Sequence, residues 1–186
     1  MVWMHEHEQK LILDCLTEDT TMLEWGSGGS TLYFSSFVEK YYSIEHDKDW
    51  YENIFEQIKD YPLNDIVYKF IEPNKENPDG RQSEYDMFKD YIDGVDSFNT
   101  KFDVVLIDGR ARRLCAKKVI PYLKPDSVVF IHDYILRTPY HVVEDYYELV
   151  DYIDYTEQTI GKLKLRDSFK ENAYDLDLSG NERLEG

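Results

Sequence analysis

Long apolar runs and cysteine are both scarce in this sequence. No apolar stretch among its 186 residues approaches the roughly twenty that a membrane-spanning helix needs. The two cysteines, Cys15 and Cys115, each fall in a helix-like stretch, so we expect reduced thiols rather than a disulfide. Residues 1–8 lack the basic and apolar regions of a signal peptide. These absences predict a cytoplasmic chain with no membrane partner.

Basic residues are scarce as well. The chain has 21 Lys and Arg against 38 Asp and Glu, which gives a net charge of -17. A protein that binds nucleic acid needs basic surface to displace counterions from phosphates. The dense basic group within residues 110–118 is too small for a tRNA or DNA substrate. We therefore expect no nucleic-acid partner.

A glycine turn at residues 26–29 lacks the third glycine of a dinucleotide site, which follows the pattern G-x-G-x-x-G. Residues 20–25 before it predict a short buried strand, and Ser30 or Thr31 is placed to cap a helix after it. Glycines let the backbone take positive φ and let a ligand approach the main chain. The first amides of the helix would point at that ligand.

A second strand, residues 40–45, follows and ends in the acid Glu45. Strand, glycine turn, helix, strand and acid form a nucleoside-binding βαβ unit, in which the acid is placed for the two ribose hydroxyls. We therefore expect a nucleoside cofactor. The predicted cofactor-binding residues are Glu24, Gly26, Ser27, Gly28, Ser30, Thr31, Glu45, His46, Glu72 and Asp108.

Strands and helices alternate through most of the chain. The patterns predict strands at 20–25, 40–45, 66–71, 101–109, 126–131, 150–155 and 159–165, and helices at 5–16, 30–38, 50–59, 84–95, 111–123 and 138–149. Such alternation favours an α/β fold with a doubly wound, mostly parallel seven-stranded sheet and a C-terminal antiparallel pair. We expect one domain over residues 1–167, a loose polar tail over 168–186, and an irregular loop over 74–82.

The predicted strands end in titratable residues. Glu24, Glu45, Glu72, Asp108 and the pair at 132–133 would meet at one edge of the sheet, where ligands of open α/β sheets lie. Unpaired acids there would repel one another, and a cationic sulfonium or a metal ion would ease the repulsion. This favours S-adenosylmethionine over an anionic dinucleotide.

The segment Glu24-x-Gly26-x-Gly28 resembles the first motif of the class I S-adenosylmethionine-dependent methyltransferases. The resemblance extends over residues 20–165 and implies that Glu24 interacts with the methionine ammonium end of the cofactor. The third glycine of that family falls at position 30, which is serine here. The family also has a Rossmann-like sheet that ends in a hairpin.

The fourth and fifth strands, ending in Ile107-Asp108-Gly109 and Ile131-His132-Asp133, are similar to those of class I O-methyltransferases. Catechol-type members imply that Asp108 and Asp133 hold Mg²⁺ or Mn²⁺, with His132 as an alternative third ligand. Tyr134 stands where those members have asparagine. Glucuronoxylan-type members, which the chain also resembles, imply a sugar hydroxyl as the methyl acceptor.

Methyl transfer to a hydroxyl needs a group that takes its proton. Asp108, His132 and Asp133 are the predicted catalytic residues, although His132 can equally be a structural side chain. The predicted substrate-binding residues are Trp3, Arg110, Arg112 and Tyr134. Trp3 can instead pack on the first helix, and the two arginines can instead be solvated surface.

The leading hypothesis is thus an S-adenosylmethionine-dependent O-methyltransferase that acts on a sugar or glycan. A metal-dependent, catechol-like enzyme and a non-catalytic cofactor-binding module remain as alternatives. A larger assembly or a homo-oligomer is compatible with each. An NAD-linked short-chain reductase is disfavoured because no Tyr-x-x-x-Lys pair follows the fourth predicted strand.

Overall fold

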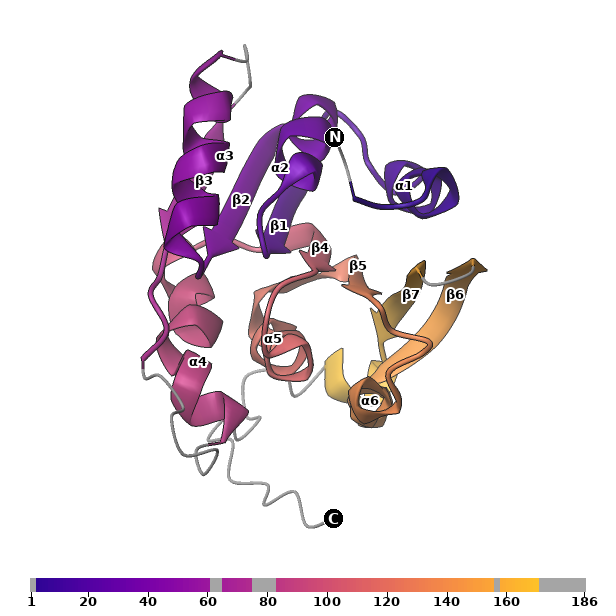
Figure 1. Cartoon of the computed structure of the whole chain (residues 1–186). Helices are drawn as coiled ribbons and strands as arrows, with labels where there is room; N and C mark the ends of the chain where they lie inside the picture. The colour runs from indigo at the N-terminus through magenta and orange to yellow at the C-terminus, as the bar shows by residue number, and fades with distance from the viewer. Residues whose placement is uncertain (1–2, 61–64, 75–82, 156–157, 171–186) are drawn as a thin grey trace.

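The computed structural model describes residues 3–60, 65–74, 83–155 and 158–170, and its centre is a seven-stranded sheet in the order β3-β2-β1-β4-β5-β7-β6 (Figure 1). Its strands are β1 (Thr21–Trp25), β2 (Lys40–Glu45), β3 (Ile66–Phe70), β4 (Phe102–Ile107), β5 (Leu123–His132), β6 (Tyr147–Tyr155) and β7 (Gln158–Leu165). The strands β1 to β5 are parallel, and β7 runs antiparallel to both β5 and β6. The predicted fold class is confirmed.

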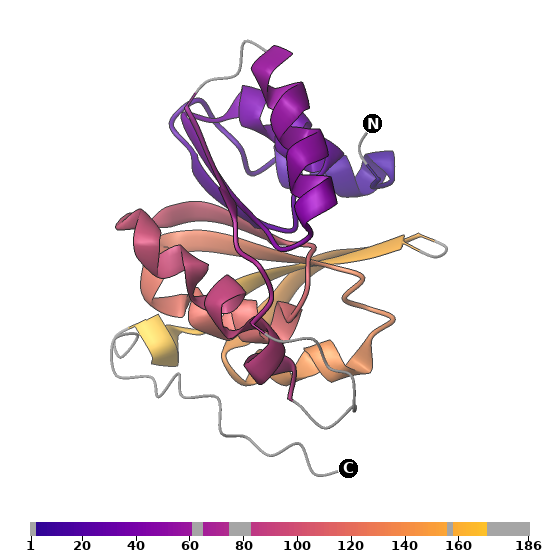
Figure 2. The same ribbon diagram turned by 60° about the vertical axis from the view of Figure 1, so that its left-hand side comes forward.

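Helices cover both faces of the sheet (Figure 2). α1 (Glu6–Leu13), α2 (Gly29–Phe34) and α3 (Lys48–Asp60) lie on one face, and α4 (Glu84–Asp93) and α5 (Arg112–Lys118) on the other. Short 3-10 helices lie at Ser35–Phe37, Gly94–Phe98, Ile120–Tyr122 and Thr138–Asp145, and α6 (Asp167–Lys170) ends the described chain. The central strands are therefore buried on both sides, which explains their nearly continuous apolar sequences.

Each face of the sheet has its own apolar core. In β1, Leu23 and Trp25 belong to the core beneath α4 and α5, and Met22 belongs to the core beneath α1 and α2. This is the two-residue period of a strand. Glu24 shares the face of Met22, so its side chain points toward α2. The direction of this strand-end acid matters for the site described below.

The predicted helix at 138–149 is wrong in its second half. Residues Thr138–Asp145 form a 3-10 helix, and β6 begins at Tyr147, three residues before the predicted strand start. Tyr147 pairs with Leu165 of β7, and its buried hydroxyl donates to Ala116 O at 2.6 Å. These distant partners outweigh the local helical pattern.

Two further predictions fall mainly outside the described residues. The loop predicted at 74–82 has only Asn74 within them, and its Oδ1 accepts from the Asp90 amide at 2.8 Å. The tail predicted at 168–186 is described only to Lys170, where α6 places Phe169 with its ring 5.3 Å from that of Tyr146. In the described ranges, no helix is long and apolar enough to cross a membrane.

The turn after β1 packs directly on the turn after β4. Gly26 has φ +90, and a Cβ on it would lie 2.4 Å from Gly109 N. Both the backbone conformation and the contact require glycine. The two turns are thereby held together at the edge of the sheet where the parallel strands end.

Replacing Gly26 should destabilise the fold. We expect Gly26→Ala to lower the free energy of unfolding by about 2 kcal/mol or more, because alanine is strained at positive φ and its Cβ would overlap Gly109. Gly28→Ala is the matched control. Gly28 has an extended φ of -179, and its Cβ would meet no atom closer than 3.8 Å. Equal losses in urea unfolding would contradict this assignment.

Candidate active site

A hollow of about 1080 Å³ lies where β1, β2, β4 and β5 end. Most of the residues that the sequence predicts to bind cofactor or substrate, or to act on it, line this hollow. They are Trp3, Gly26, Ser27, Gly28, Ser30, Glu45, His46, Asp108, Arg110, Arg112, His132 and Asp133. The predicted convergence of strand-end residues is therefore present in the fold.

Other residues of the hollow have no counterpart in the predicted set. They are Met4, Gly29, Asp47, Asp49, Trp50, Asn53, Ile54, Gln57, Gly109 and Gln158. Several lie in the first turns of α3, directly after Glu45. Because they follow a predicted strand end, the sequence alone could have indicated them as residues of the site. Trp50 donates from Nε1 to Ser27 O at 2.5 Å, so it holds the glycine turn. Gln158 comes from β7, and no local pattern identifies it.

Four predicted site residues do not line the hollow. Glu24 and Thr31 lie beneath the glycine turn, and Glu72 is exposed beyond the end of β3. Tyr134 is fully buried, its hydroxyl donates to Glu144 at 2.8 Å, and its ring packs on Gly161 of β7. Tyr134 therefore supports the junction of β5 and β7 and is not exposed to a substrate in the hollow.

Glu24 is fully buried and bonded to hydroxyl groups. It accepts from Ser30 Oγ and Thr31 Oγ1 at 2.5 Å each, and from Ser43 Oγ at 3.0 Å. Burial raises the pKa of Glu24 to about 7, although these three hydrogen bonds favour the charged form. The side chain ties the start of α2 to β1 and β2, and so it shapes the turn from below.

Glu45 fixes the turn from the side of the hollow. It accepts hydrogen bonds from the amides of Ser27 at 2.8 Å, His46 at 2.7 Å and Asp47 at 2.8 Å. Ser27 Oγ donates to it at 3.0 Å, and His46 Nδ1 lies 2.8 Å from Oε1. Burial disfavours the charged carboxylate, but the bonds from His46 and the Asp47 amide prevail and lower the pKa of Glu45.

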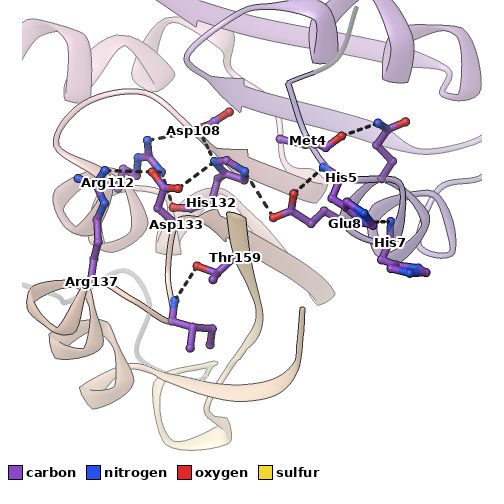
Figure 3. A network of polar contacts seen from close by, with 12 residues as sticks. Met4, His5, His7, Glu8, Asp108, Arg112, His132, Asp133, Arg137 and Thr159 are labelled. Atoms are coloured by element: carbon purple, nitrogen blue, oxygen red, sulfur yellow. Dashed lines mark hydrogen bonds and ion pairs between the residues drawn. The ribbon is translucent and has the colours of Figure 1, made fainter. Parts of the chain in front are cut away.

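The ends of β4 and β5 bring two acids and two cationic side chains together (Figure 3). Arg112 Nη2 lies 3.3 Å from Asp108 Oδ1, and Arg112 Nη1 lies 3.2 Å from Asp133 Oδ2. The same guanidinium also donates to the carbonyls of Gly109 and His132. Arg112 is therefore held by both strand ends, and it neutralises both acids.

His132 is sandwiched between carboxylates. Its Nδ1 lies 2.9 Å from Asp108 Oδ1, and its Nε2 lies 3.4 Å from Oε1 of Glu8 on α1 (Figure 3). Burial disfavours the imidazolium, but Asp108 and Glu8 outweigh it and raise the pKa of His132 to about 10. His132 is thus protonated at neutral pH and does not accept a proton there.

The arrangement does not fit the predicted divalent metal. Asp108 and Asp133 share the Arg112 guanidinium, and Asp133 Oδ2 also lies 3.2 Å from Arg137 Nη2. A metal ion bound by both acids would meet the cationic Arg112 and the imidazolium of His132 at close range. Within the described part of the chain, no group of three or more His, Cys, Asp or Glu side chains could hold a metal. The structure thus does not support the predicted metal site.

Known structures share this architecture, whereas no protein-family model and no curated protein matches the sequence. A methyltransferase-like protein from Silicibacter pomeroyi matches with a TM-score of 0.67 and 20% identity, over 93% of this chain and 94% of the other. An rRNA methylase from Streptococcus thermophilus matches with 0.62 and 8%, over 89% and 99%. A Streptococcus mutans protein in complex with SAH matches with 0.61 and 9%, over 87% and 97%. The chain has the fold of class I S-adenosylmethionine-dependent methyltransferases.

The buried Glu24 should make stability depend on pH. Because its folded pKa is about 7 against 4.5 for the free group, the folded chain binds more protons between these values, and its stability falls as pH rises through them. Glu24→Gln lacks this dependence. Its free energy of unfolding, relative to wild type, should rise by up to about 3 kcal/mol from pH 4.5 to 7.5. Urea unfolding at several pH values measures this difference, with the exposed Glu39→Gln as control. A constant difference would contradict it.

Proposed function

We propose that the chain is an S-adenosylmethionine-dependent O-methyltransferase that needs no divalent metal. The observation that carries the proposal is one hollow that joins the glycine turn and Glu45 to the Asp108 carboxylate. The fold places these groups at the carboxyl ends of parallel strands, where ligands of open α/β sheets bind. The fold it shares with known methyltransferases supports the same reaction class.

The residues of the hollow suit a cationic nucleoside. The backbone of the turn at 26–29 would hold the amino-acid end, and Glu45 would bind the ribose hydroxyls. A ribose hydroxyl can replace Ser27 Oγ as a donor to Glu45, and the released Ser27 Oγ keeps Tyr68 OH at 2.5 Å as its partner. Asp47 and Asp49 add negative charge to the wall. The cofactor supplies a methyl group on a positively charged sulfur.

Asp108 is the group best placed to receive the proton of an acceptor hydroxyl. Its Oδ1 lies 2.9 Å from His132 Nδ1 and 3.3 Å from Arg112 Nη2, so we assign its other oxygen, Oδ2, to the acceptor. The two cations hold the carboxylate in one orientation. When the acceptor oxygen gains the methyl group, its proton passes to Oδ2. His132 cannot take this role because both of its ring nitrogens face carboxylates.

A sugar or glycan hydroxyl is the acceptor that we propose. The hollow contains side-chain amides and carboxylates suited to a polyhydroxylated ligand, from Asn53, Gln57, Gln158 and Asp133. Trp3 is 75% exposed beside them and offers a ring face for stacking. One structural neighbour is an rRNA methylase. The net charge of -17 opposes RNA as the substrate of this chain.

Calorimetry tests the proposal that Glu45 binds the ribose of S-adenosylmethionine. We expect Glu45→Gln to weaken S-adenosylmethionine binding about tenfold in calorimetry, because a charged acceptor of the ribose hydroxyls becomes a neutral amide. Glu72→Gln is the matched control, since Glu72 also follows a strand but is exposed and does not line the hollow. Equal affinities in the two variants would place the nucleoside elsewhere.

Turnover tests the proposed metal-independent methyl transfer to a sugar hydroxyl. S-adenosylhomocysteine should form with at least one member of a panel of sugars and glycans, equally with EDTA and with added Mg²⁺ or Mn²⁺. Asp108→Asn should lower kcat by about 100-fold or more, as expected for loss of the group that takes the proton. Asp126→Asn, an exposed acid far from the hollow, is the control. Loss of turnover with EDTA would restore the metal-dependent alternative, and binding without turnover would favour a non-catalytic module.

A further inference from the structure

Two buried atoms at the base of the hollow face only each other. Glu8 Oε1 and His132 Nε2 are both buried without a hydrogen-bond partner in the described chain, and they lie 3.4 Å apart. Glu8 is fully buried although it belongs to a short surface helix. A buried carboxylate is costly unless a cation compensates it. The imidazolium of His132 is that cation.

Capping of α1 does not account for this charge. Glu8 Oε2 accepts from the His5 amide at 2.8 Å and completes a capping box at the start of the helix. A glutamine can make the same bond, since capping boxes use either residue. The second oxygen, which is directed at His132, is therefore the part of Glu8 that only a carboxylate supplies.

We propose that Glu8 is a positioning residue of the reactive end. It holds the ring of His132, and the ring in turn holds Asp108 with Oδ2 turned to the acceptor. This inference rests on the proposed function for the role of Asp108. It also assigns a role to α1, because the reactive end is complete only when this helix is docked against the end of β5.

The geometry around His132 explains why a second anchor is needed. Its Nδ1 faces Asp108 Oδ1 at 2.9 Å, but Asp133 Oδ1 lies only 3.6 Å away. A ring held from one side can turn from one acid to the other. With Nε2 fixed by Glu8, Nδ1 stays on Asp108. The charge of Glu8 also supports the imidazolium, whose pKa is raised.

The segment that carries Glu8 also builds part of the wall. Trp3 and Met4 line the hollow directly before α1, and Gln9 Nε2 donates to Met4 O at 2.8 Å. The ring of His5 stacks on Tyr155 of β6 with centroids 4.3 Å apart. Glu8 thus links this wall to Asp108 through one histidine (Figure 3).

Glu8→Gln tests the inference, with Glu6→Gln as the matched control on the exposed side of the same helix. We expect Glu8→Gln to lower kcat at least tenfold while the Kd for S-adenosylmethionine changes less than twofold, since Glu8 does not line the hollow. Glu8→Asp keeps the charge at a shorter reach and should lose less of kcat. An unchanged kcat in a folded Glu8→Gln variant would overturn the proposal, as would equal losses in kcat and cofactor affinity.

A second readout does not depend on the enzymatic function. In the chain labelled with ¹³C-aspartate, the carboxyl signal of Asp108, assigned by Asp108→Asn, should move in Glu8→Gln but not in Glu6→Gln. The shift should disappear when His132 is also replaced by Gln, because that ring contacts both Glu8 and Asp108 and so connects them. If Glu8→Gln does not fold, Glu8→Asp is compared in the same way. If wild type shows no turnover but Glu8→Gln still moves the Asp108 signal, the proposed function is rejected and the contact path from Glu8 through His132 to Asp108 is retained. If the Asp108 signal does not move in Glu8→Gln, the proposal that Glu8 positions Asp108 through His132 is rejected.

Discussion

Charge compensation at one edge of the sheet is the constraint on which this site depends. Parallel strands bring their carboxyl ends together, and here those ends carry acids. Arg112, at the start of α5, and His132, at the end of β5, neutralise Asp108 and Asp133, so the chain provides its own cations. Glu24 has no cationic partner among these groups. Three hydroxyl groups donate hydrogen bonds to it, and burial raises its pKa. Asp108 and Asp133 are thus compensated by shared cations, whereas Glu24 is compensated by hydrogen bonds.

Much of the fold could be predicted because its signals are local. The glycine turn and the apolar run of β4 each mark an element within a few residues. The helix predicted at 138–149 failed because the start of β6 depends on β7, where Tyr147 pairs with Leu165 and Leu149 pairs with Leu163. Nothing within Tyr146, Tyr147 and Leu149 alone distinguishes a helical face from a strand that is paired on one side.

The site was predictable where a strand end carries a polar residue, as with Glu45, Asp108 and His132. The site was less predictable where the direction of a side chain decides whether it lines the hollow. Glu24 and Tyr134 have suitable positions in the sequence, but the period of the strand and the packing against Gly161 turn their side chains away from the hollow. Glu8 and Gln158 reach the region from distant segments, and such contacts exist only after the sheet has assembled.

The contact between Gly26 and Gly109 has a consequence for any redesign of this chain. Main chain touches main chain there, and a side chain added at Gly26 would overlap Gly109 and destabilise the fold. The glycine turn, which we propose binds the methyl donor, and the turn at Gly109, beside the proposed acceptor site, are consequently held together as one unit. A new acceptor preference would have to be engineered from the rim, at α3 or at the hairpin, and transplanting either glycine loop alone would disrupt its neighbour.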